Sequence, residues 1–163
     1  MAIHRVFAAI EHWPLSIWMR EDAYAYFVAL IFHAFGMALL VGAGIVISLR
    51  FLGAARDSNL RRYRGFHVVM WLGAALAIVS GLLLLCAYPA KALTNPVFAV
   101  KLASLLAAAL LVRAMAAATP DSVRDPQPTS RSRALAGLAL ALWLIGVAAG
   151  KLLLHTYSVL TVS

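Results

Sequence analysis

The chain has 163 residues, of which 64% are hydrophobic and 12% charged, and it carries a formal net charge of +8. A soluble domain is about half apolar and a quarter charged, so this composition predicts an integral membrane protein without room for a second sizeable domain. Most of the basic residues lie in short loops between apolar stretches, so the charge indicates membrane topology and not nucleic-acid binding. The single cysteine, Cys86, excludes an internal disulfide.

Residues 1–22 are predicted to form a periplasmic interfacial segment that precedes the membrane domain. Apolar residues at helical spacing predict a short amphipathic helix, with a turn after it, and Pro14 ends the apolar run. Trp13 and Trp18 suit the headgroup layer, where aromatic rings are enriched. The segment has no continuous apolar stretch of the kind that marks a secretory signal peptide.

Residues 23–163 are predicted to form the membrane domain, an all-α four-helix up-down bundle. The apolar stretches are each long enough to cross a bilayer and cover about residues 23–49, 65–88, 97–118 and 134–157. The connections between them are short, which favours antiparallel neighbours. Before the third span, Thr94 or Asn95 can cap the helix, and Pro96 fits its first turn.

Lys and Arg are distributed unevenly between the two sides of the predicted bundle. The side that holds the loops after the first and third spans carries nine arginines, whereas the opposite side carries Arg5, Arg20 and Lys91. Cytoplasmic loops are enriched in basic residues. The bias therefore predicts cytoplasmic Arg-rich loops, periplasmic termini and, for a bacterial protein, an inner-membrane location.

Three ionisable residues lie well inside the predicted spans: His33, Lys101 and Lys151. Helical rise places His33 about 26 Å above Arg50 and Lys151 about 27 Å above Arg133, and it places Lys101 about 18–25 Å above the end of its own span. The three are thus expected to share one layer in the outer half of the bilayer. His155 follows Lys151 by four residues and is expected on the same helix face.

Each of these residues also has a simpler interpretation. A lysine near a helix end can extend its ammonium group to the headgroups. His155 alone would be an interfacial histidine, and His33 alone would be a core histidine that bonds a backbone carbonyl or a serine. Four such groups on three helices are harder to explain singly, because each costs a few kcal/mol to insert at depth.

Imidazoles from two helices of a bundle are a common way to ligate a b-type haem, with nearby cations neutralising its propionates. The pattern therefore predicts His33 and His155 as haem and metal ligands. Lys101 and Lys151 are predicted as propionate or anion partners, and Gly36 is predicted to leave room for the flat ring. His67 begins the second span at the other side of the membrane and is not expected to share a metal with His33.

Several segments resemble a bacterial family of uncharacterised four-helix integral membrane proteins, which is distantly similar to CopD-like and b-type cytochrome four-helix membrane domains. The segments that carry the resemblance are His33–Gly36, Leu39–Gly42, Ser48–Gly53, Ser80–Leu84, Asn95–Leu102, Trp143 and Gly150–Lys151. Members often have a histidine near the end of the third span, where this chain has Val112 and Arg113. This departure leaves His155 as the candidate second ligand.

Three functions follow from these patterns. The first is a haem b subunit that passes electrons between a periplasmic redox partner and the quinone pool or a larger membrane complex. The second is a cofactor-free accessory subunit of such a complex, and the third is a protein that binds or transports copper or a small anion. No hydrolase or kinase motif is present, so a non-catalytic redox or accessory role is favoured over an enzyme.

Overall fold

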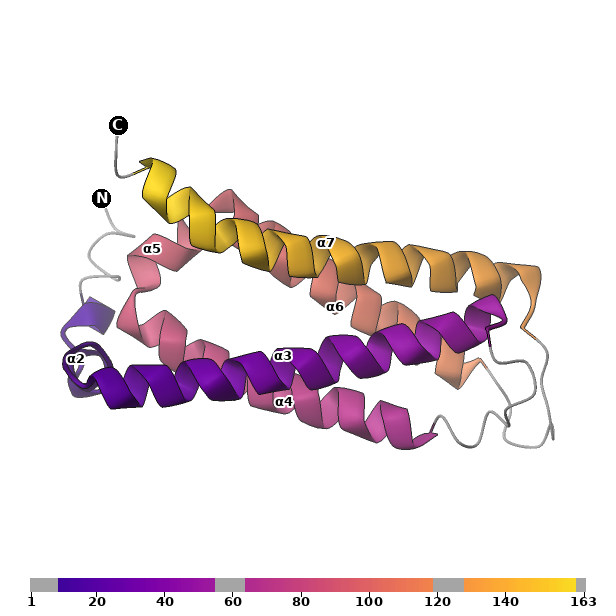
Figure 1. Ribbon diagram of the computed structural model, residues 1–163, viewed down its shortest axis with the longest axis horizontal. Helices are drawn as coiled ribbons and strands as arrows, with labels where there is room; N and C mark the ends of the chain where they lie inside the picture. Colours follow the sequence, from indigo (N-terminus) through magenta and orange to yellow (C-terminus); the bar gives the residue numbers. More distant parts are fainter. Residues whose placement is uncertain (1–8, 55–63, 119–127, 161–163) are drawn as a thin grey trace. The chain divides into compact units, whose positions relative to one another are not determined.

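A computed structural model of the chain describes residues 9–54, 64–118 and 128–160. In this part of the chain the regular elements are all helices (Figure 1): α2 (Pro14–Glu21), α3 (Ala23–Leu52), α4 (Arg64–Ala87), α5 (Pro89–Leu93), α6 (Pro96–Ala117) and α7 (Ser130–Leu160). Four of them, α3, α4, α6 and α7, are long and apolar enough to cross a membrane. The predicted all-α class with four membrane helices is confirmed.

The helix boundaries differ from the predicted ones at the start of α2, at α5 and at the start of α7. Pro14 does not lead into a turn but begins α2, because a proline is well tolerated in the first turn of a helix. A short helix, α5, occupies the predicted loop after the second span. α7 begins at Ser130, four residues early, and the Thr129 hydroxyl accepts a hydrogen bond from the backbone N–H of Ser132 at 3.2 Å. As predicted, Pro96 is the first residue of α6.

Both ends of α3 are closed by local hydrogen bonds. At its start, the Asp22 carboxylate accepts hydrogen bonds from the backbone N–H groups of Tyr24 and Ala25, at 2.9 and 3.3 Å. At its end, Gly53 has a φ of 103°, a left-handed conformation that favours glycine. The N–H groups of Gly53 and Ala54 then bond the carbonyls of Arg50 and Leu49, which is the Schellman pattern of helix termination.

The chain forms two compact units, and both α3 and α4 contribute to each of them. The first unit comprises Met1–Leu40 and Trp71–Pro96, and the second comprises Val41–Met70 and Val97–Ser163. The first unit thus contains α2, α5 and parts of α3 and α4. The second contains the rest of α3 and α4 together with α6 and α7. The predicted boundary between an interfacial segment and a membrane domain at residue 22 stays a prediction.

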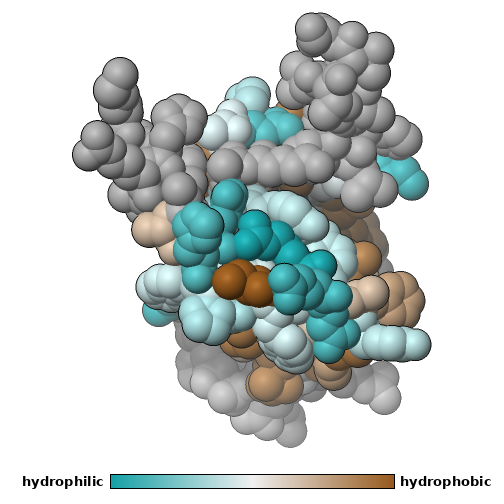
Figure 2. Space-filling view, turned by 90° about the vertical axis from the view of Figure 1, so that its left-hand side faces the viewer, coloured by the Kyte–Doolittle hydropathy of each residue, from teal (hydrophilic) through white to brown (hydrophobic). Residues whose placement is uncertain are grey.

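In the first unit, α2 is attached to the neighbouring ends of α3 and α4. Met19 of α2 is buried against Ala29 and Ala87, and the Ser16 hydroxyl donates a hydrogen bond to the Cys86 carbonyl at 2.8 Å. On the other side of α2, Trp18 is exposed. Figure 2 views the molecule from this end and shows many hydrophilic residues on its described surface. An apolar inner side and an exposed tryptophan suit a helix at the membrane surface.

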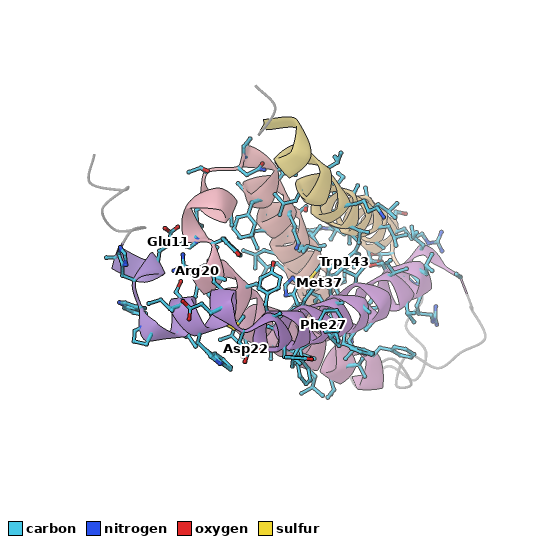
Figure 3. The ribbon with its side chains drawn as sticks, turned by 60° about the vertical axis from the view of Figure 1, so that its left-hand side comes forward. Glu11, Arg20, Asp22, Phe27, Met37 and Trp143 are labelled. Carbon is cyan, nitrogen blue, oxygen red and sulfur yellow. The ribbon has the colours of Figure 1, made fainter. Side chains whose placement is uncertain are left out.

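The polar connection into α3 lies beside α2. The Arg20 guanidinium donates a hydrogen bond to the backbone carbonyl of Glu11, and Asp22 follows directly at the start of α3 (Figure 3). These charged groups precede the apolar part of α3, which begins at Ala23. The change from charged to apolar residues at this point is typical of a membrane boundary.

The α3 and α4 backbones approach each other closely in the first unit because glycine lies on both helices. A Cβ added to Gly36 would lie 2.5 Å from the backbone nitrogen of Ala77, and one added to Gly73 would lie 2.5 Å from that of Leu40. Contacts move backward along α4 as they move forward along α3, so the two helices are antiparallel. Small residues allow this kind of close packing between membrane helices.

The second unit is built on two further antiparallel contacts. Gly146 of α7 packs against Leu105 of α6, and the two helices lie side by side (Figure 1). The fully buried indole of Trp143 on α7 lies against Gly44 of α3. Each contacting pair runs antiparallel (Figure 1), as an up-down order requires.

The sequence predicts Arg50 at the start of the Arg-rich loop that follows the first span, and the structure places it differently. It lies within the last turn of α3, and only 1% of its surface is exposed. Arg50 is therefore part of the packed interior of the second unit, and not a solvated loop charge. Its position in the basic side of the topology count is unchanged, so the predicted orientation stays a prediction.

Candidate functional site

The candidate site is centred on His33, a half-buried residue near the middle of α3. Its Nδ1 atom lies 3.0 Å from the carbonyl oxygen of Ala77 and 3.3 Å from the hydroxyl oxygen of Ser80, both on α4. All three residues belong to the first unit. The imidazole thus links α3 to α4, which the simpler sequence interpretation of His33 anticipated.

These two contacts fix the protonation of the imidazole. A carbonyl oxygen only accepts hydrogen bonds, so Nδ1 must carry a proton and donate it to Ala77. Ser80 agrees with this assignment, because its hydroxyl donates to the Leu76 carbonyl at 2.6 Å and its oxygen is left to accept from Nδ1. In the neutral ring with this tautomer, Nε2 is the nitrogen that carries the lone pair.

Gly81 provides the surface on which the imidazole rests. A Cβ at this position would lie 3.1 Å from Cε1 of His33 and 3.3 Å from Nδ1. A contact this short would require the ring or the helix to shift. Ala77, Ser80 and Gly81 therefore hold the imidazole from one side, within little more than one turn of α4.

The structure corrects the predicted role of Gly36. The space beside Gly36 is filled by the backbone of α4, since an added Cβ would meet the nitrogen of Ala77 at 2.5 Å and its Cα at 2.9 Å. Gly36 therefore serves the close approach of α3 and α4, and it does not leave room for a flat ring. Any large ligand of His33 must lie on another side of the imidazole.

The other predicted site residues belong to the second unit. Lys101 of α6 is half-buried, and its side chain lies over Gly150 of α7, with Cε 3.5 Å from the position of an added Cβ. Lys151, the next residue of α7, is exposed. His155 lies on α7, but its side chain is outside the described residues. A common level for His33, the lysines and His155 stays a prediction.

His67 lies in the first turn of α4. Ala77, to which His33 donates, is ten residues further along the same helix, which corresponds to about 15 Å of helical rise. Among the described residues, no group of three or more His, Cys, Asp or Glu side chains could together hold a metal ion. A site built from protein ligands alone, such as a closed zinc or copper centre, therefore has no support in this part of the chain.

No family model matches this chain, and no curated protein or solved structure matches it either. The similarity to CopD-like and b-type cytochrome domains thus stays a prediction from the motifs. The chemistry of the site rests on the geometry of its own residues.

The sequence interpretation did not identify the partners of His33 on α4. Ser80 and Gly81 place a hydroxyl group and a residue without a side chain next to each other in an otherwise apolar span. A serine one residue before a glycine in a membrane helix marks a place where another helix can approach and form a hydrogen bond. The Ala77 carbonyl carries no such signal, because every residue in a helix has one.

Proposed function

We propose that this chain is a membrane-embedded redox subunit that binds a b-type haem through Nε2 of His33. The observation that supports the proposal is the hydrogen bond from Nδ1 of His33 to the Ala77 carbonyl. Histidines that ligate metals commonly donate their other ring N–H to a carbonyl or carboxylate, which fixes the tautomer and makes the ligating nitrogen more basic. The bond to Ala77 prepares His33 for this role.

The residues around His33 would orient the ligand without forming part of it. Ala77 and Ser80 hold the plane of the imidazole, and Gly81 lets the ring lie close to α4. Haem iron bound here would carry one electron at a time, at a potential set by its axial ligands and their hydrogen bonds. A role for His155 as a second ligand stays a prediction from the sequence.

The same subunit would sit in a bacterial inner membrane with both termini in the periplasm, as the distribution of Lys and Arg favours. His33 would then lie in the outer half of the bilayer. Electrons would pass between a periplasmic redox partner and the quinone pool or a larger membrane complex. The chain would hold the haem at a fixed depth in the bilayer, and its partners would donate and accept the electrons.

An absorption spectrum of the purified protein tests this proposal. We expect the Soret and visible bands of a b-type haem, either as purified or after reconstitution with haemin, in a ratio approaching one haem per chain. His67→Ala should leave these bands unchanged, because His67 is about 15 Å of helical rise away from the α4 residues that hold His33. The absence of haem bands after reconstitution would contradict the proposal.

A second function is favoured by the same hydrogen bond. The contacts of His33 with Ala77 and Ser80 already satisfy one side of the ring and tie α3 to α4. A histidine used only in this way would suit a cofactor-free accessory subunit of a larger membrane complex. This alternative predicts a stoichiometric protein partner after purification in mild detergent, and no haem.

A further inference from the structure

Lys101 and Lys151 lie on neighbouring helices of the second unit. Lys101 is half-buried on α6, and Lys151 is exposed on α7. The two helices are in direct contact here, since the Lys101 stem lies over Gly150 and Leu105 lies over Gly146 one turn away. Because glycine has no side chain, the Lys101 stem can lie close to the α7 backbone at Gly150.

Neither ammonium group has a hydrogen-bond or ion-pair partner among the described residues. The chain has six acidic residues, and none of them lies in the described part of the second unit: Glu11, Glu21 and Asp22 belong to the first unit, and Asp57, Asp121 and Asp125 lie outside the described residues. A charged group within a membrane helix is costly unless a partner or the interface compensates it. An anion from outside the described residues would compensate these charges.

The position of Lys101 along α6 indicates which anion this is. Lys101 lies five residues after Pro96, the first residue of α6, or about 7 Å of helical rise from the helix start. A lysine stem covers most of this distance, so its ammonium group can extend toward the level at which a membrane helix leaves the hydrocarbon region. The phosphates of the lipid headgroups lie at this level.

We propose that Lys101 and Lys151 bind the phosphate of one anionic phospholipid beside the contact between α6 and α7. Two ammonium groups from adjacent helices would share the phosphate oxygens, and the lipid tails would lie along the apolar surfaces of the two helices. Basic pockets between membrane helices bind anionic headgroups in this manner. The site uses no residue of the first unit, so it does not depend on haem at His33.

The test is a titration of the purified full-length chain with phosphatidylglycerol, followed by native mass spectrometry. One phosphatidylglycerol should bind in preference to phosphatidylcholine. Each of Lys101→Gln and Lys151→Gln should weaken its binding about fivefold, and the double variant should weaken it about 25-fold, as expected for about 1 kcal/mol per cation. Arg113→Gln is the matched control, because it removes one exposed cation from the other end of α6 and should leave binding unchanged.

A second pair of variants separates the shape of the site from its charge. Gly150→Leu would occupy the surface under the Lys101 stem, and it should weaken binding although both lysines remain. Gly137→Leu is its control on α7, where the nearest side-chain atom to an added Cβ is 4.0 Å away. Lys101→Arg keeps the positive charge and should retain lipid binding. This result would attribute the weaker binding of Lys101→Gln to its lost charge.

Three results would overturn the proposal. The first is equal binding of phosphatidylglycerol by the wild-type chain and the double variant. The second is displacement of the lipid by millimolar inorganic phosphate, which would identify a free anion as the ligand. The third is displacement by added haemin, which would assign the two lysines to haem propionates.

Discussion

Gly36→Ala is expected to destabilise the protein, whereas Gly42→Ala on the same helix should not. The Cβ at residue 36 would lie 2.5 Å from the Ala77 nitrogen and 3.0 Å from the Gly73 oxygen, both of them backbone atoms of α4. Backbone atoms of a helix cannot move aside singly, so α3 and α4 would have to separate. Overpacking of this kind costs about 1–3 kcal/mol.

Gly42 provides a matched control because an added Cβ there meets nothing within 4 Å. Alanine favours a helix over glycine by about 1 kcal/mol, so Gly42→Ala should be neutral or stabilising. The two variants carry the same chemical change on the same helix and are expected to differ in sign. Unfolding of each protein in mixed detergent and SDS, followed by circular dichroism, measures the two free energies. Equal stability of both variants would show that α3 and α4 do not cross at Gly36.

Trp143→Ala is expected to have the largest effect on stability, a loss of about 3–5 kcal/mol in the free energy of unfolding. Trp143 is fully buried, and its ring lies so close to α3 that a Cβ at Gly44 would be 2.4 Å from it. Removal of the indole leaves a buried cavity between α3 and α7. Lipid cannot fill this cavity as easily as it fills a gap at an exposed position. Leu144→Ala is the control, because Leu144 is 64% exposed and its truncation should change stability by less than about 0.5 kcal/mol.

Trp143→Phe distinguishes packing from hydrogen bonding at the same position. The indole N–H of Trp143 has no hydrogen-bond acceptor among the described residues. A buried donor without an acceptor costs about 1–3 kcal/mol, and phenylalanine removes it while it keeps most of the ring. We therefore expect Trp143→Phe to lose much less stability than Trp143→Ala. A loss as large as that of alanine would indicate a hydrogen bond from the indole to a group outside the described residues.

The four membrane helices could be predicted from sequence because their length and apolar composition are enough to identify them. The packing faces could not be predicted in the same way. A helix that is apolar on all sides has no periodic pattern that separates its inner face from its lipid-facing one. The useful signals were the glycines: Gly36 and Gly73 mark the contact of α3 with α4, and Gly44 marks the place of Trp143.

The candidate site was predicted only in part for a related reason. His33 stands out because an ionisable residue in an apolar span is rare, and its interhelical hydrogen bond was one of the interpretations considered. The choice of Ala77 and Ser80 as partners depends on the register of α3 against α4, which composition does not encode. The sequence predicts Arg50 in a loop because charge alone does not show that the last turn of α3 is buried.

His33→Ala, compared with the wild-type protein under the same reconstitution with haemin, tests the central proposal most directly. The measurement is the reduced-minus-oxidised absorption spectrum, with the free energy of unfolding measured on matched samples before haemin is added. We expect the haem bands of the wild-type chain to disappear in His33→Ala. Without haem, the free energy of unfolding should fall only by the value of one interhelical hydrogen bond, about 0.6 kcal/mol in a membrane protein. Haem bands that persist in His33→Ala, or that are absent from the wild-type protein, would contradict the account.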